Sequence, residues 1–241
     1  MNKQKTIIEK TYKDKSIVET FDYEREKYFY QRDKHKIESN FLINTLNLFN
    51  KPIKVLDVAC GTGRMLNEVF KSKNNIDYYG LDTSKEMISK LKNKTKEKIH
   101  LNIADASKLP YKDNTFDVTY TFHLLWHLPK ETQEEIVKDM FRVTKNNGYV
   151  IIDYINKDFI FEKFKKLFGL KTAGIYKLSK KELEFIIKSN KYSLEKLLDI
   201  PLFNSFLYFP FHLFNLCRKI LPSFLFHMCF VRIKKEDSFN V

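Results

Sequence analysis

The sequence predicts an α/β fold built on a doubly wound, Rossmann-like sheet of seven strands. Short β-branched runs alternate with amphipathic helical stretches after Ile53. This alternation implies right-handed βαβ units and a parallel sheet with both faces covered. The chain has 241 residues, of which 43% are hydrophobic, and this is enough apolar material for one large core. One α/β domain with additions is therefore the expected architecture.

Seven segments have the length and the β-branched or aromatic content of strands. They are Ile53–Val58, Ile76–Leu81, Ile99–Ile103, Phe116–Phe122, Gly148–Ile155, Tyr192–Ile200 and Phe224–Ile233. Helices are expected over Arg64–Phe70, Ser84–Lys92, Lys130–Val143 and Ser179–Ser189. Ser84 and Ser179 are expected to cap two of them, because a serine hydroxyl accepts from free backbone N–H groups of a first turn.

A leading helix is expected over Tyr23–Phe49, where apolar residues recur at helical spacing before Pro52. We therefore interpret residues 1–50 as an N-terminal helical cap and residues 51–241 as the α/β domain. Two segments interrupt the rhythm of that domain. They are residues 157–177, interpreted as an inserted aromatic and basic helix, and residues 201–222, interpreted as an apolar helical insertion before the last strand.

The charge distribution indicates a solvated surface. Lys and Arg total 43 against 30 Asp and Glu, a formal charge of +13, but the lysines are scattered through nearly every segment. The three cysteines are too few for a disulfide framework and form no CxxC pair, so we expect a reducing compartment and no metal site. The N-terminal residues include no apolar signal region, which predicts a cytoplasmic protein.

The sharpest local feature is the glycine turn after the first strand, Asp57-Val58-Ala59-Cys60-Gly61-Thr62-Gly63. Its glycines let a ligand approach the backbone closely, and the start of the next helix offers free N–H groups. Leu66 stands where the third glycine of a dinucleotide fingerprint would stand, so a nicotinamide or flavin dinucleotide is disfavoured. Asp57 would repel a pyrophosphate but can hold a cationic ligand.

Acidic residues also follow the next two expected strands. Asp82 comes about 25 residues after Asp57, near the place where an acidic residue binds ribose hydroxyls in dinucleotide folds, and Asp105 follows the third strand. Such sheets bind ligands at the carboxyl ends of their strands, so a ribose without a pyrophosphate fits these acids. Local roles are the alternative, since Asp57 can cap the next helix and Asp82 can hold Ser84 in a capping box.

Four segments, in order and correctly spaced, resemble the class I methyltransferases, in particular the type 11 group that includes the ubiquinone and menaquinone methylases. They are VLDVACGTGR, YYGLDTSKEMI, DASKLPYKDNTFDVTYTFHLLWHL and FRVTKNNGYVIIDY, and they cover Lys54–Tyr154. The resemblance implies a seven-stranded methyltransferase sheet. It also implies S-adenosylmethionine as the cofactor and methyl transfer as the activity.

The resemblance assigns the amino-acid portion of the cofactor to the glycine turn. Gly61 and Gly63 would face it, with Asp57 near its ammonium group, and Ala59 stands where such turns often have a glycine. The ribose and adenine contacts match residues after the second and third strands. There Asp82 would accept from the ribose hydroxyls, Thr83 and Met87 would flank the adenine, Asp105 would accept from its amino group, and Ala106 would lie beside it.

The leading segment of this family can also close over the cofactor carboxylate with an aromatic residue and an arginine. The matching residues are Tyr23 and Arg25. Arginine suits a carboxylate because its donors form a rigid fork. A surface charge on an exposed helix is the alternative for this arginine.

Two histidines just past the fourth expected strand, His123 and His127, are the candidate catalytic residues. An acceptor hydroxyl or enolisable carbon must lose a proton, and imidazole titrates in a suitable range. In the resembled family this segment borders the methyl group and the acceptor, and His127 matches a histidine often present there. The alternative is that each histidine only satisfies a backbone carbonyl.

The acceptor is expected to be a small molecule, aromatic or lipid-like, because of residues 201–222, PLFNSFLYFPFHLFNLCRKILP. This segment has no charge before Arg218 and is broken by prolines, so it does not match a membrane-spanning helix. It can roof an apolar pocket, form a peripheral membrane contact, or pack as a helix across the sheet edge. The methylated atom, O, C or N, and the oligomeric state stay open.

Two other functions are kept as alternatives. The first is methylation of an RNA ribose or another non-amino position, although nucleic acid is disfavoured because the motifs of the base methylases are absent. The second is a catalytically silent binding subunit with this fold. The intact glycine turn and three acids argue against the second alternative.

Overall fold

The structure is a computed structural model that describes residue 14 and residues 16–20, 29–159, 175–189, 193–200 and 228–236. Several sequence predictions fall outside the described residues and stay predictions. They concern Tyr23, Arg25, most of the 157–177 insertion and all of residues 201–222.

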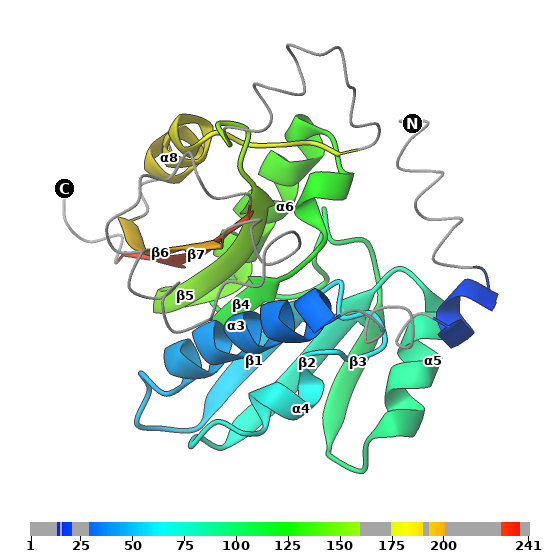
Figure 1. The fold of residues 1–241 in the computed structure, drawn as a ribbon. Helices are drawn as coiled ribbons and strands as arrows, with labels where there is room; N and C mark the ends of the chain where they lie inside the picture. Colours follow the sequence, from blue (N-terminus) through cyan, green and yellow to red (C-terminus); the bar gives the residue numbers. More distant parts are fainter. Residues whose placement is uncertain are drawn as a thin grey trace.

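A central sheet of seven strands organises the molecule (Figure 1). The strands are β1 (Ile53–Val58), β2 (Ile76–Asp82), β3 (Ile99–Ile103), β4 (Phe116–Thr121), β5 (Thr144–Ile155), β6 (Ser193–Ile200) and β7 (Met228–Lys234). Their spatial order is β3-β2-β1-β4-β5-β7-β6, and the first five of these pair in parallel. The chain moves outward from β1 to β3 and then returns to the other side of β1 with β4, which is doubly wound topology. The predicted α/β class is confirmed.

The last strand departs from the expected parallel sheet. β7 runs antiparallel to both β5 and β6, between which it lies. An antiparallel neighbour of β6 needs no crossover helix, whereas a parallel one would. Phe230 and Val231 of β7 are fully buried, so this strand is part of the core.

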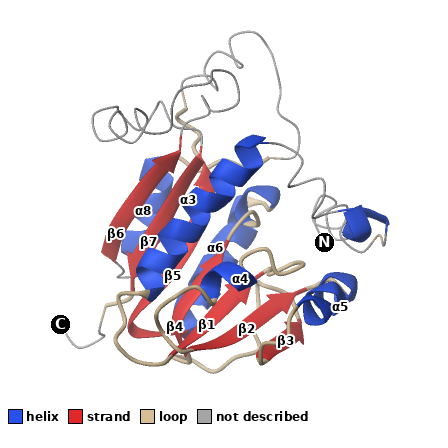
Figure 2. Cartoon of the chain, turned by 60° about the horizontal axis from the view of Figure 1, so that its bottom comes forward, coloured by secondary structure: helices blue, strands red, loops and turns tan. Residues whose placement is uncertain are grey.

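Helices cover both faces of the sheet (Figures 1 and 2). They are α3 (Phe29–Leu46), α4 (Leu66–Val69), α5 (Lys85–Lys94), α6 (Lys130–Val143) and α8 (Lys180–Ser189). The apolar sides of α3, α4 and α5 form one buried cluster with the sheet, and those of α6 and α8 form another. Ile53 and Val55 of β1 pack in the first cluster and Leu56 and Val58 in the second, which explains why apolar residues face both sides of this strand. In the part of the chain that is described, no helix has the length and apolar character needed to cross a membrane.

Both predicted serine caps are present. The Ser84 hydroxyl accepts from the Met87 N–H at 3.1 Å at the start of α5. At the start of α8, the Ser179 hydroxyl accepts from the Glu182 N–H at 3.1 Å, and the Glu182 carboxylate accepts from the Ser179 N–H at 2.8 Å. The second arrangement is a full capping box.

Several element boundaries differ from expectation, and two of the differences have a clear physical reason. The helix expected from Arg64 begins only at Leu66, because Gly61 and Gly63 have left-handed φ angles of 54° and 79° and keep the preceding turn out of helical geometry. β5 begins at Thr144, four residues before Gly148, because Thr144 already pairs with Phe116 of β4. A register shift after Phe116 accommodates the extra length.

The leading helix α3 is an integral layer of the fold. Leu42 and Leu46 are fully buried, and the Phe41 ring lies 6.2 Å from the Phe230 ring of β7. Arg232 of β7 also donates to the Thr45 hydroxyl at 3.3 Å. Figure 2 shows α3 lying along one face of the sheet on this side. The helix therefore carries its polar residues to fixed positions beside the strand ends.

Candidate active site

A cavity lies at the carboxyl ends of the parallel strands and gathers most of the predicted site residues. Those that line it are Asp57, Ala59, Gly61, Asp82, Thr83, Met87, Asp105, Ala106, His123 and His127. Of the predicted site residues that the structure describes, Gly63 alone is absent from the lining. Residues that the sequence reasoning did not select also line it, among them Arg64, Phe122, Leu124, Leu128 and Ile136.

The two glycines of the turn have different surroundings. A Cβ placed on Gly61 would meet no described atom within 4 Å, so its backbone is open to a ligand. A Cβ on Gly63 would lie 2.1 Å from Leu91 Cδ1 of α5, so this glycine serves helix packing. Ala59 has a φ of 61°, a left-handed conformation that costs an alanine roughly 1–2 kcal/mol. That conformation explains why glycine is frequent at this position.

The surroundings of the two glycines predict different losses of stability. Gly61→Ala is expected to cost roughly 1–2 kcal/mol from the left-handed backbone alone. Gly63→Ala adds overpacking against Leu91, for a total of roughly 2–5 kcal/mol. Urea unfolding of both variants measures the difference, and equal losses would contradict the packing role of Gly63.

Asp57 is held by two tyrosines from the neighbouring strands. Its Oδ2 accepts from the hydroxyl of Tyr78 of β2 at 2.9 Å and from that of Tyr120 of β4 at 2.7 Å. Burial raises the pKa of Asp57 to about 6, while the two hydroxyls act in the opposite direction. The carboxyl is therefore mostly ionised at neutral pH and fixed at the centre of the strand ends. In this position it bonds tyrosines instead of capping α4.

Asp82 joins the glycine turn to the next helix. Its Oδ2 accepts from the Gly61 N–H and its Oδ1 from the Ser84 N–H, both at 2.9 Å. The local role and the ligand role are compatible, because each carboxylate oxygen has a second lone pair. Asp105 is similarly fixed, since its Oδ1 accepts from both the backbone N–H and the hydroxyl of Ser107, at 2.9 and 2.8 Å.

The two predicted histidines are not equivalent. The indole N–H of Trp126 donates to His127 Nε2 at 3.0 Å, and because indole is only a donor, that nitrogen carries no proton and is occupied. His123 has a left-handed φ of 65°, and its backbone N–H donates to both oxygens of Asp153 at 3.0 and 3.1 Å. Its Nε2 lies 2.6 Å from Glu38 Oε1. Non-glycine residues in this conformation cluster at functional sites.

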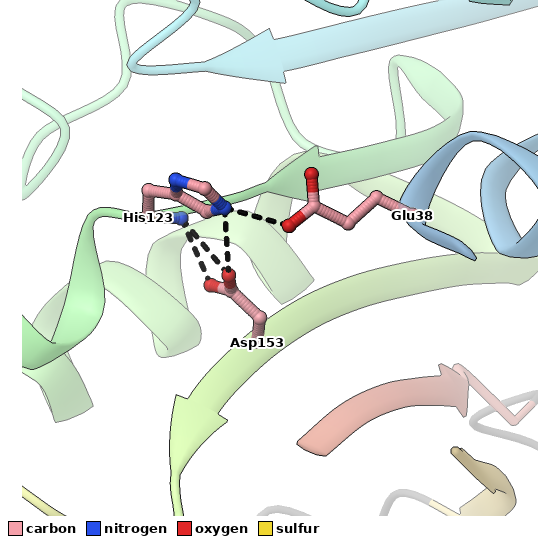
Figure 3. A group of neighbouring side chains, drawn as sticks. All are labelled: Glu38, His123 and Asp153. Atoms are coloured by element: carbon pink, nitrogen blue, oxygen red, sulfur yellow. Dashed lines mark hydrogen bonds and ion pairs between the residues drawn. The ribbon is translucent and has the colours of Figure 1, made fainter. Parts of the chain in front are cut away.

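A buried polar cluster that the sequence did not reveal surrounds His123 (Figure 3). Glu38 comes from α3 and Asp153 from β5, and both side chains are fully buried. Arg64 Nη1 bonds the second oxygen of Glu38 and also His35 Nδ1, at 2.9 Å from the latter. The cluster therefore ties the leading helix to the glycine turn and to the ends of β4 and β5.

The cluster sets three different protonation states. Burial would raise the pKa of Glu38, but His123, Arg64 and Lys34 hold that pKa well below its usual range. Burial lowers the pKa of His123 well below its usual value, and Lys34 and Arg64 lower it further against the effect of Glu38. Burial raises the pKa of Asp153 to about 8, with a contribution from Glu38. At neutral pH Glu38 is ionised, His123 is neutral and Asp153 is mostly protonated.

The topology and the site indicate the class of protein. The doubly wound sheet, with an open glycine turn after β1 and acids at the ends of β1, β2 and β3, has the fold of the class I S-adenosylmethionine-dependent methyltransferases. Residues 56–152 match the family described as a methyltransferase domain. The cofactor of this class is S-adenosylmethionine, and the backbone left open at Gly61 beside Asp82 fits such a ligand.

Two curated relatives and one solved structure illustrate the similarity. Demethylmenaquinone methyltransferase of Staphylococcus epidermidis is 34% identical over 134 residues, which are 54% of each chain. Ajmaline N-methyltransferase of Rauvolfia serpentina is 29% identical over 114 residues, 45% of this chain and 38% of that one. The chain thus spans about half the length of the curated relatives it matches.

Among solved structures, magnesium protoporphyrin IX methyltransferase from Synechocystis PCC 6803, with bound SAH, has a TM-score of 0.65. The match covers 97% of this chain and 100% of that one, at 16% sequence identity. At this level of sequence identity, the similarity shows the fold alone.

Proposed function

We propose that this protein transfers a methyl group from S-adenosylmethionine to O, C or N of a small, aromatic or lipid-like acceptor. The observation that carries the proposal is the convergence of Asp57, Asp82 and Asp105 on one cavity beside the open Gly61 turn. Three acids at three successive strand ends suit a ligand with an ammonium group, a ribose and an adenine amino group, and they disfavour a pyrophosphate.

In this proposal each part of the cofactor meets residues with matching chemistry. Asp57, ionised at neutral pH, lies near the ammonium group, and Asp82 accepts from the ribose hydroxyls with its free lone pairs. Thr83 and Met87 flank the adenine. Asp105 accepts from the adenine amino group, with Ala106 beside it.

The acceptor side of the cavity supports an apolar substrate. Phe122, Leu124, Leu128 and Ile136 line it next to the two histidines. The two curated relatives above are named for demethylmenaquinone and ajmaline, which are both small organic molecules. Residues 201–222 are proposed to complete this side, with a peripheral membrane contact as the alternative role for that segment.

Calorimetric titration with S-adenosylmethionine and, separately, NADH tests the cofactor assignment. We expect micromolar binding of the first and none of the second. Asp82→Asn is expected to weaken binding about 100-fold or more, because hydrogen bonds to a charged group contribute about 1.5–3 kcal/mol each and two are affected. Failure of the unaltered protein to bind S-adenosylmethionine would overturn the proposal and favour the silent binding subunit.

Asp139→Asn is the matched control. Asp139 also accepts from a backbone N–H, that of Leu109 at 2.6 Å, but it does not line the cavity. Its replacement is expected to leave the affinity for S-adenosylmethionine unchanged. If both variants lose binding equally, the loss reflects the fold and Asp82 is not a ligand residue. Release of S-adenosylhomocysteine in the presence of phenols, quinols and lipids then identifies the acceptor class.

A further inference from the structure

We propose that Glu38 is a positioning residue that makes Nδ1 of His123 the base of this site. The site would then serve acceptors that lose a proton when they are methylated, such as a phenol, an enol or an amine N–H. This inference rests on the proposed function. It assigns the base to His123 and not to His127, and it gives the leading helix α3 a part in the chemistry.

Glu38 determines the tautomer of His123. Glu38 Oε1 lies 2.6 Å from His123 Nε2 (Figure 3). Arg64 donates to the other oxygen of Glu38, and Lys34 Nζ lies 3.7 Å from Oε1, so the carboxylate is ionised and can only accept. His123 must therefore carry its proton on Nε2, which leaves the lone pair on Nδ1.

Nδ1 of His123 points away from the cluster. Figure 3 shows it on the side of the ring away from both carboxylates. Nδ1 has no hydrogen bond in the described part of the structure. If it were buried it would be a buried polar atom without a partner, and among the described residues only Gln133 Oε1 is such an atom. Nδ1 is therefore accessible, and it opens to the cavity that His123 lines. Asp153 holds the His123 backbone with both oxygens, and the contact between Nε2 and Glu38 fixes the ring direction.

Methylation of an acceptor X–H releases one proton, and His123 is placed to accept it. When bound, S-adenosylmethionine supplies a methyl group on a sulfonium sulfur, and transfer to an acceptor X–H forms X–CH₃, leaves the S–C electron pair on sulfur and frees the proton of X. Nδ1 of His123 accepts this proton. The imidazolium so formed lies against the Glu38 carboxylate, while Lys34 and Arg64 oppose the new charge and favour its return to solvent.

The close approach of Glu38, His123 and Asp153 does not require a metal ion. The ligand-type atoms of Glu38, His123 and Asp153 lie within 4.8 Å of one another. Arg64 and Lys34 already face Glu38, and Asp153 is mostly neutral at pH 7, so the cluster has no excess negative charge. The arrangement matches an oriented base better than a cation site.

Histidine NMR of the full-length protein tests the proposal without any acceptor. Two-bond ¹H–¹⁵N spectra report which ring nitrogen is protonated, and a His123→Gln spectrum assigns the signals of His123 among the six histidines. We expect the Nε2–H form in the unaltered protein. In Glu38→Gln the new amide must direct its oxygen to Arg64 and its NH₂ to His123, so the tautomer is expected to invert to Nδ1–H.

Glu68→Gln is the matched control, because Glu68 lies 3.8 Å from Nε2 of another histidine, His35, outside the cavity. It is expected to leave the His123 signals unchanged. An Nδ1–H form in the unaltered protein would overturn the proposal, even if Glu38→Gln does not fold. A tautomer that stays the same in folded Glu38→Gln would also overturn it.

A kinetic measurement connects the tautomer to the reaction. With a phenolic acceptor, Glu38→Gln is expected to lower kcat about 100-fold or more, since general base catalysis contributes roughly 10²–10⁴-fold. The Kd for S-adenosylmethionine, measured by calorimetry, is expected to stay within about threefold. An unchanged kcat would overturn the role of Glu38. If the unaltered protein does not bind S-adenosylmethionine at all, the proposed function is refuted instead.

Discussion

Asp153→Asn is expected to raise the free energy of unfolding by on the order of 4 kcal/mol at pH 7. The pKa of the buried Asp153 carboxyl is raised from 3.8 to about 8, so the folded protein holds a proton that the unfolded chain releases. One pKa unit corresponds to about 1.4 kcal/mol. The free-energy cost of folding with Asp153 protonated therefore grows as the pH rises above the pKa of this carboxyl in the unfolded chain. Asparagine keeps the acceptor for the His123 N–H and has no charge to bury.

The pH dependence gives this prediction its test. In the unaltered protein, the contribution of Asp153 to stability is expected to fall from about pH 4 to about pH 8 and then level off. Urea unfolding of Asp153→Asn across this range is expected to show that slope removed. Asp117→Asn is the control, since Asp117 is also buried but pairs with Lys145 at 2.7 Å. Removal of this ion pair is expected to lower the free energy of unfolding. If Asp153→Asn destabilises at pH 8, Asp153 is an ionised and well paired group.

Glu38→Ala is expected to lower the free energy of unfolding by roughly 3–5 kcal/mol. Removal of one partner from a buried ion pair leaves the other charge unpaired, and here Arg64 loses its carboxylate. Urea unfolding measures the loss. Glu68→Ala is expected to cost at most about 1 kcal/mol, because its partner Lys71 is largely exposed. A similar small loss for Glu38→Ala would mean that the cluster does not anchor α3.

The meeting of three acids in one cavity could be predicted from the sequence, because a parallel sheet gives one simple rule. Acids that follow β1, β2 and β3 must meet at one edge, and Asp57, Asp82 and Asp105 do. The caps at Ser84 and Ser179 were predictable for a similar reason, since capping depends on residues three positions apart. The antiparallel direction of β7 was not predictable, because both directions have the same apolar pattern.

The polar cluster around His123 depends on contacts that no local pattern contains. Glu38 is 85 residues from His123 in sequence, and Asp153 is 30 residues from it. Two signals were nevertheless present. Glu38 falls on the same helix face as the buried Phe41 and Leu42, and Asp153 interrupts the apolar run over Tyr149–Ile155. A charge in either place has to find a buried partner.

Trp126 is the only tryptophan in the sequence, and it lies between the two histidines of the site. Its ring is 5.0 Å from the His123 ring, its N–H bonds His127, and Lys34 Nζ lies 5.2 Å from its centre. Tryptophan fluorescence therefore comes from a single site, next to the atoms proposed to take part in the reaction. The protein thus has a native optical probe, through which ligand entry and protonation of His123 can be followed in real time without a label.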